Sequence, residues 1–133
     1  MRASLFAYCF VVILTVVPAA YATTSIVKDI AFSGPNQSSS PQSIAAAGRY
    51  AYFSADDGIH GAELWKTDGA DAGTVLVKDV LPGRYGSNPT NITVADKLVY
   101  FVARDLDGHP QLWRSDGSDA GTWLLRKDMT VCE

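Results

Sequence analysis

The sequence predicts an all-β protein built from two four-stranded antiparallel repeats of about 48 residues, each similar in size to one blade of a β-propeller. The twelve-residue string at residues 63–74 recurs at residues 111–122, 48 positions later. Short apolar runs separated by Asp- and Gly-rich turns flank both copies, and no segment has a helical period with caps. Closed propellers usually need about four to eight blades. Two repeats are therefore incomplete as a closed propeller.

The strands of each repeat follow from short runs that alternate or are rich in β-branched and aromatic residues. Residues 44–80 form the first repeat and residues 92–128 the second, with a Pro/Gly linker at 81–91 between them. Aspartate and glycine dominate the connections, as turn chemistry requires. The expected strands are Ile44–Ala46, Tyr50–Ala55, Ala62–Thr67 and Thr74–Lys78 in the first repeat, and Ile92–Ala95, Leu98–Ala103, Gln111–Ser115 and Thr122–Arg126 in the second.

A stray strand precedes the first repeat. Residues 23–43 contain Ser25–Ile30 followed by a Ser/Gln-rich linker, and Lys28-Asp29-Ile30 matches Lys78-Asp79-Val80 at the end of the first repeat. The segment thus corresponds to the last strand of a repeat whose other strands are missing. Repeats bury their apolar faces against neighbours, so we expect further repeats or copies of the chain to complete the fold.

Two sets of repeated residues are predicted to be structural. An aromatic residue that recurs once per repeat normally packs between neighbouring blades. The predicted repeat core is Leu64, Trp65, Leu112 and Trp113. Gly residues beside Asp supply the positive φ that tight turns need. The predicted structural turns contain Asp68, Gly69, Gly73, Asp116, Gly117 and Gly121.

Residues 1–22 have the plan of a secretory signal peptide. Arg2 precedes an apolar run from Leu5 to Val17, and small residues stand before the expected cleavage point after Ala22. The run is shorter than the roughly 20 residues that span a bilayer. We therefore expect a secreted, periplasmic or cell-surface protein with no transmembrane segment after cleavage. Its five-residue tail, 129–133, contains Cys132, which would be the only cysteine left.

Composition and motifs exclude several classes of function. The formal net charge is −3, and no basic block is present to bind a phosphate backbone, so nucleic acid is not an expected partner. The sequence has no nucleophile motif, phosphate loop or zinc-ligand spacing around its two histidines, His60 and His109. We predict no catalytic residue, no metal and no cofactor. Calcium at Asp-rich turns is the alternative, and the candidate pairs are Asp56 with Asp57, Asp68 with Asp71, Asp105 with Asp107, and Asp116 with Asp119.

The strings ELWKTDG at residues 63–69 and QLWRSDG at 111–117, each followed after two further residues by Ala-Gly-Thr, resemble the ELWxxDGT repeat family. The resemblance extends over nearly all of the chain after residue 22. It implies an exported, mostly bacterial, multi-repeat protein with a propeller-like β fold and no established catalytic residues. Gln111 replaces the leading Glu of the motif, and His109 stands one place away from the position of His60.

We therefore expect an exported, non-catalytic β-repeat protein, or a fragment of a larger propeller-like protein, that serves in surface interaction or scaffolding. The alternative is a carbohydrate-binding module that uses Trp123 and the Asp-rich turns, with or without calcium. Trp123 carries this alternative because it breaks the repeat, standing where the first repeat has Val75. A third hypothesis is a piece of a hydrolytic propeller. The partner, protein or glycan, is not identified by the sequence.

Overall fold

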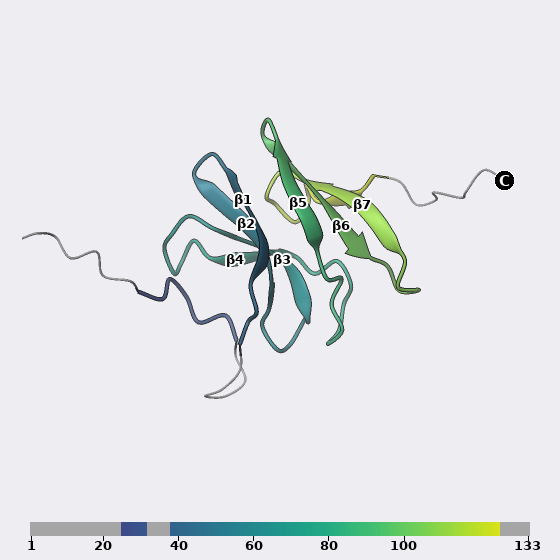
Figure 1. The fold of residues 1–133 in the computed structure, drawn as a ribbon, viewed down its shortest axis with the longest axis horizontal. Coiled ribbons are helices and arrows are strands. Elements are labelled where there is room, and N and C mark those ends of the chain that lie inside the picture. Colours follow the sequence, from purple (N-terminus) through teal and green to yellow (C-terminus); the bar gives the residue numbers. More distant parts are fainter. Residues whose placement is uncertain (1–24, 32–37, 126–133) are drawn as a thin grey trace, which may run out of the picture.

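The computed structural model describes residues 25–31 and 38–125 and contains two antiparallel four-stranded sheets (Figure 1). The strands pair in chain order within each sheet, and neither sheet closes on itself. This confirms the predicted all-β class with two four-stranded units. The first sheet contains β1 (Gln42–Ala47), β2 (Tyr50–Asp56), β3 (Ala62–Thr67) and β4 (Val75–Lys78), and the second contains β5 (Thr90–Ala95), β6 (Leu98–Arg104), β7 (Pro110–Ser115) and β8 (Trp123–Leu124).

The two sheets repeat each other down to backbone detail. Gly48 and Asp96 take positive φ in the two-residue loops that join the first two strands of each sheet. A bulge interrupts the first strand of each sheet, with Ser43 at φ 54° and Asn91 at φ 52°. Because a bulge leaves one residue out of the ladder, both strands bend at the same place. The sequence repeat is thus also a repeat of local geometry.

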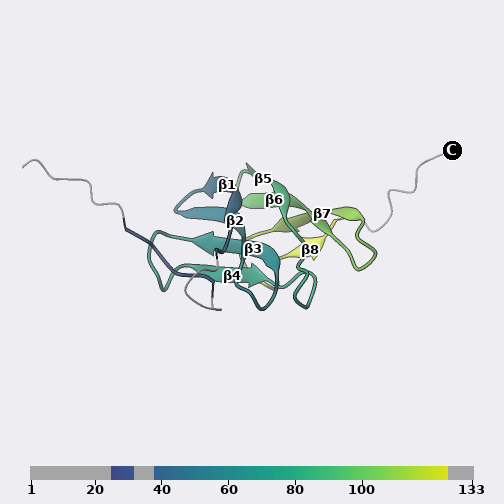
Figure 2. The ribbon, with the colours of Figure 1, turned by 60° about the horizontal axis from the view of Figure 1, so that its bottom comes forward.

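The main core lies at the junction where the inner faces of the two sheets pack together, with β1 beside β5 (Figures 1 and 2). The fully or nearly fully buried residues there come from both sheets. They are Tyr52, Leu64 and Val77 from the first sheet and Ile92, Val99, Phe101 and Ala103 from the second. Trp113 packs against this core, and its ring stacks on Phe101 with centroids 6.3 Å apart.

A smaller core covers the outer face of the first sheet, which is the face turned away from the second sheet. Phe53 and Trp65 pack there against Ile30, which is only 8% exposed. Ser25–Ile30, expected as a strand, is not paired as one. Lys28 anchors the segment instead, with Nζ 3.3 Å from the carbonyl oxygen of Asp71 and 3.7 Å from its carboxylate.

One predicted core residue is not buried within the described part of the chain. Leu112 is 44% exposed, although its counterpart Leu64 is fully buried. Side chains alternate along a strand, so Trp113 faces the junction while Leu112 lies on the outer face of the second sheet. In the first sheet, Leu64 and Trp65 are both buried because the second sheet covers one face and Ile30 the other. None of the described residues covers Leu112 in this way.

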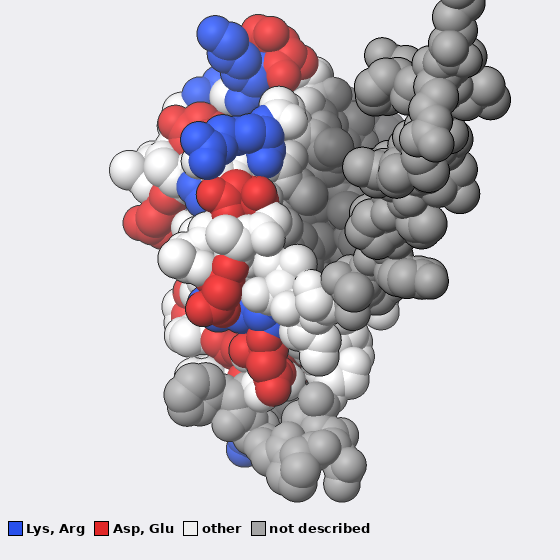
Figure 3. All heavy atoms as spheres, turned by 90° about the vertical axis from the view of Figure 1, so that its left-hand side faces the viewer, with Lys and Arg blue, Asp and Glu red and all other residues white. Residues whose placement is uncertain are grey.

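The signal peptide predicted at residues 1–22 and the tail at 129–133, with Cys132, lie outside the described residues. Within the described ranges, no helix is present that is long and apolar enough to cross a membrane. Figure 3 shows acidic and basic side chains intermixed on the face at the left of Figure 1. The described residues on that face therefore present no extended field of one sign.

Candidate functional site

A groove lies between the linker that follows β4 and the turn that joins β6 to β7. Its volume is about 390 Å³, and a hollow of about 370 Å³ that shares several of the same walls extends it toward Val80 and Trp113. We call it the linker groove. The residues that line it are Leu81, Pro82, Tyr85, Gly86, Asn88, Arg104, Asp105, Leu106 and Gly108.

Glu63 holds the linker wall of the groove in place. Its carboxylate is fully buried and accepts hydrogen bonds from the backbone N–H groups of Val80 (3.2 Å), Leu81 (3.1 Å) and Ser87 (2.8 Å) and from the Ser87 hydroxyl (2.6 Å). Burial raises the pKa of Glu63, and these donors oppose the shift because they favour the charged form. The linker is thereby tied to β3 by one side chain.

The linker also lies against the turn between β2 and β3 through two glycines. Gly61 and Gly86 have φ of +70° and +61°, and a Cβ on either one would overlap backbone atoms of the other segment. Only glycine allows this close approach of two backbones. The linker wall is thus held by glycine contacts as well as by Glu63.

Asp105 organises the opposite wall. Its Oδ1 accepts the N–H groups of Asp107 (3.1 Å) and His109 (2.8 Å), and its Oδ2 accepts the side-chain amide of Gln111 (2.9 Å). The hydrogen bond from the backbone of His109 is the main cause that lowers the pKa of Asp105, followed by the bond from Gln111. The N–H of Arg104 donates to the carbonyl of Ser87 at 2.7 Å, so the two walls are also bonded to each other.

Two large apolar side chains project from these walls into solvent. Tyr85 on the linker is 91% exposed and Leu106 on the turn is 88% exposed. Both line the groove together with Arg104, which is also exposed. Tyr and Arg are, together with Trp, the residue types that are enriched at the energetic centres of protein interfaces.

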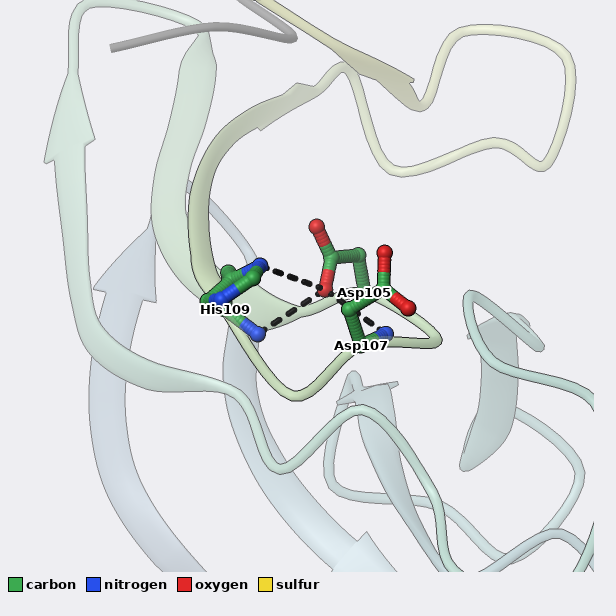
Figure 4. Close-up of side chains that lie close together, drawn as sticks. All are labelled: Asp105, Asp107 and His109. Carbon is green, nitrogen blue, oxygen red and sulfur yellow. Dashed lines mark hydrogen bonds and ion pairs between the residues drawn. The ribbon is translucent and has the colours of Figure 1, made fainter. Parts of the chain in front are cut away.

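The same turn contains a group that could hold a metal ion (Figure 4). Ligand atoms of Asp105, Asp107 and His109 all lie within 4.8 Å of one another. Asp107 and His109 are exposed, and Asp105 Oδ1 already accepts two backbone N–H groups. The arrangement therefore matches a turn that the Asp105 carboxylate stabilises. Calcium binding at this turn stays a prediction from the sequence.

The predicted turn residues form the connections between β3 and β4 and between β7 and β8. Gly69 and Gly117 have φ of +91° and +90°, which favours glycine. A Cβ on Gly73 would overlap the Asp68 carboxylate, and one on Gly121 would overlap that of Asp116. The two carboxylates accept the N–H groups of Ala70 (3.0 Å) and Ser118 (2.9 Å). The Asp and Gly residues of the repeated motif thus form one compact turn.

Trp123 lies on β8, away from the residues that line the linker groove. Its side chain is 43% exposed, and the guanidinium of Arg114 lies 3.8 Å from its ring centroid. One ring face is therefore occupied by a cation–π contact. The Asp116–Gly121 turn is its nearest Asp-rich segment along the chain.

The linker groove is not marked by any pattern that predicts a site from the sequence. Tyr85 lies in the linker, where nothing in the repeat marks it as a site. The only available signal was Leu106, an apolar residue that stands in an Asp/Gly turn where the first repeat has Gly58.

The turn between β2 and β3 is the counterpart, in the first sheet, of the turn between β6 and β7. It contains an ion pair and does not line the groove. Asp57 Oδ2 lies 2.7 Å from His60 Nδ1, and this hydrogen bond is the main cause that raises the pKa of His60. Burial alone would raise the pKa of Asp57, but hydrogen bonds from His60 and Ile59 outweigh it and lower that pKa. Both groups are therefore charged in the folded state at mildly acidic pH.

We expect His60→Ala to lower the melting temperature most between about pH 4 and 6.5. The stabilisation by Asp57 is complete above its unfolded pKa, and that by His60 is complete below its unfolded pKa. As pH rises through the raised folded pKa of His60, the ring loses its charge and the stabilisation disappears. Thermal melts from pH 5 to pH 9 should show a difference of about 1 to 3 °C at the acid end that shrinks at the alkaline end.

The control is His109→Ala, because His109 is 72% exposed and its Nδ1 lies 3.9 Å from Asp105. Its difference from the wild type should depend less on pH. A His60→Ala difference that is constant over the whole range would contradict the ion pair.

No known protein-family model, curated protein or solved structure matches the chain.

Proposed function

We propose that the chain is an exported, non-catalytic β-repeat protein whose two sheets are propeller-like blades, and that it acts in surface interaction or scaffolding through the linker groove. The resemblance to the ELWxxDGT repeat family and the expected signal peptide at residues 1–22 support the exported repeat protein. The observation that carries the interaction role is the exposure of Tyr85 and Leu106 on the walls of one groove.

The groove suits a segment of a protein partner. Glu63 and Asp105 fix its two walls by buried or backbone hydrogen bonds, so little ordering is needed when a ligand binds. Tyr85 and Leu106 offer apolar area that a partner would remove from water, and Arg104 offers guanidinium donors beside it. A partner segment with an apolar side chain next to a carboxylate fits this combination.

Tyr85→Ser and Leu106→Ser should each reduce partner recovery about tenfold or more when the tagged protein is used to isolate binding proteins from the extracellular fraction of its source. Ile59→Ser is the matched control, because Ile59 is 55% exposed but lies in the turn between β2 and β3, outside the groove. A partner retained equally by all variants would refute the groove as its site.

A carbohydrate-binding module is the second candidate, favoured by the 43% exposure of Trp123. A sugar could stack on the ring face that Arg114 leaves open. A glycan array probed with the wild type and with Trp123→Ala, with and without a chelator, tests this role. Binding that depends on Trp123 would favour the module, and binding that is lost with the chelator would add calcium at the Asp-rich turns.

A further inference from the structure

The contacts at the junction between the two sheets are partly repeated on the outer face of the first sheet. At the junction, Lys78 Nζ lies 2.9 Å from the Asp119 carboxylate and Val80 packs against the core. On the outer face, Lys28 pairs with Asp71, which is the repeat counterpart of Asp119. Ile30, the counterpart of Val80, packs against Phe53 and Trp65. The segment 25–30 therefore takes the place that the end of a preceding sheet would take.

The outer face of the second sheet carries the counterparts of the residues with which the first sheet packs at the junction. No described segment of the chain packs on this face. Leu112 is 44% exposed and Leu125 is 42% exposed. Their repeat counterparts, Leu64 and Val77, are 0% and 4% exposed because the second sheet covers them. Tyr100 and Arg114 stand on this sheet at the positions of Tyr52 and Lys66.

The outer face of the first sheet offers the complementary half. Ile44 is 69% exposed, whereas its counterpart Ile92 is 9% exposed at the junction. An apolar groove of about 220 Å³ lies there, lined by Ile30, Ile44 and Phe53 among others.

Gly69 provides a second match. Its counterpart, Gly117, lies so close to the Tyr52 hydroxyl that a Cβ would overlap it, and the Gly117 carbonyl accepts a 2.6 Å hydrogen bond from Lys66. A Cβ on Gly69 would meet nothing within 4 Å. The surface beside Gly69 is thus open, whereas the equivalent surface beside Gly117 is in contact with the Tyr52 hydroxyl and the Lys66 ammonium group.

We infer that the outer face of the second sheet binds the outer face of the first sheet in a second copy of the chain, head to tail, in the geometry of the internal junction. Tyr100 and Arg114 of one copy then reach Gly69 of the next, and Leu112 covers Ile44. Such a contact uses two different surfaces, so it is heterologous and can continue into a ring or filament. These faces do not line the linker groove, and the inference is independent of the proposed function.

In this contact, one segment from each copy would occupy the same position. Leu125 of one copy and Val27 of the next stand at the same position of the repeat. Lys28 and Ile30 anchor the segment that contains Val27, whereas β8 beside Leu125 is two residues long. The end of β8 is therefore the part that moves when the copies join.

Two single substitutions test the head-to-tail contact. Sedimentation of the exported protein should show a mass that rises with concentration beyond that of a dimer. Leu112→Glu blocks the second sheet and Ile44→Glu blocks the first, so each alone should raise the dissociation constant roughly a hundredfold or more. An equimolar mixture of the two variants retains one intact pair of faces. It should form a one-to-one dimer of wild-type affinity and nothing larger.

Leu106→Glu is the control, since Leu106 is 88% exposed in the linker groove, and it should associate like the wild type. Unchanged melting temperatures verify that the variants fold, and Leu112→Ser with Ile44→Ser repeats the test without an added charge. A wild type that stays monomeric at the highest attainable concentration would overturn the inference. So would a mixture that forms no dimer, or an association insensitive to Ile44→Glu, which would indicate pairing of two second sheets.

Discussion

Replacing Glu63 with alanine is expected to lower the free energy of unfolding by about 3 to 5 kcal/mol. The Glu63 carboxylate is fully buried and accepts four hydrogen bonds from the linker. Alanine would leave three backbone N–H groups and the Ser87 hydroxyl without their acceptor and would open a cavity beside them. Urea unfolding followed by circular dichroism measures the loss.

The repeat supplies a matched control in Gln111, which stands at the position of Glu63 in the second sheet. Gln111 makes one hydrogen bond, to Asp105, so Gln111→Ala should cost only about 1 kcal/mol. Glu63→Gln keeps the volume but loses the charge and one acceptor, and its cost should fall between the two. Equal costs for Glu63→Ala and Gln111→Ala would show that the linker is not held by the buried carboxylate.

The strands could be predicted because each one combines a local signal with a second copy of itself in the sequence. Runs of β-branched and aromatic residues identified β2 and β6, and the turns with Asp and Gly bounded them. The exposure of Leu112 could not be predicted in the same way. Alternation places Leu112 and Trp113 on opposite faces, but it does not say which of those faces another segment covers.

The site was harder to predict than the fold because its residues act across long distances in the chain. The sequence marked Glu63 only as the first residue of the repeated motif. Its hydrogen-bond donors lie 17 to 24 residues later, in a linker with no pattern of its own. The second sheet departs from the first at this place, with Gln111 for Glu63 and His109 for Gly61. Both positions hold the linker in the first sheet. Such departures within a repeat are therefore informative about contacts.

Gly117→Ala is expected to lower the free energy of unfolding by about 2 to 4 kcal/mol. Two effects add: φ at Gly117 is +90°, which alanine adopts only with strain, and the new Cβ would overlap the Tyr52 hydroxyl across the junction. Tyr52 is 4% exposed, so its ring has little room to move aside. The substitution therefore disturbs the packing of the two sheets as well as one turn, and thermal or urea unfolding will measure both together.

Gly69→Ala separates the two effects, because Gly69 has nearly the same φ, +91°, with nothing within 4 Å of the added Cβ. It should cost about 1 to 2 kcal/mol, the strain alone. Combining Gly117→Ala with Tyr52→Phe removes the hydroxyl that the Cβ meets, so the double variant should recover most of the difference between the two single glycine variants. If Gly69→Ala and Gly117→Ala cost the same, the Tyr52 contact contributes nothing and the junction tolerates a side chain there. A larger cost at Gly117 that Tyr52→Phe relieves would instead identify this contact as the reason that the turn requires glycine at the junction.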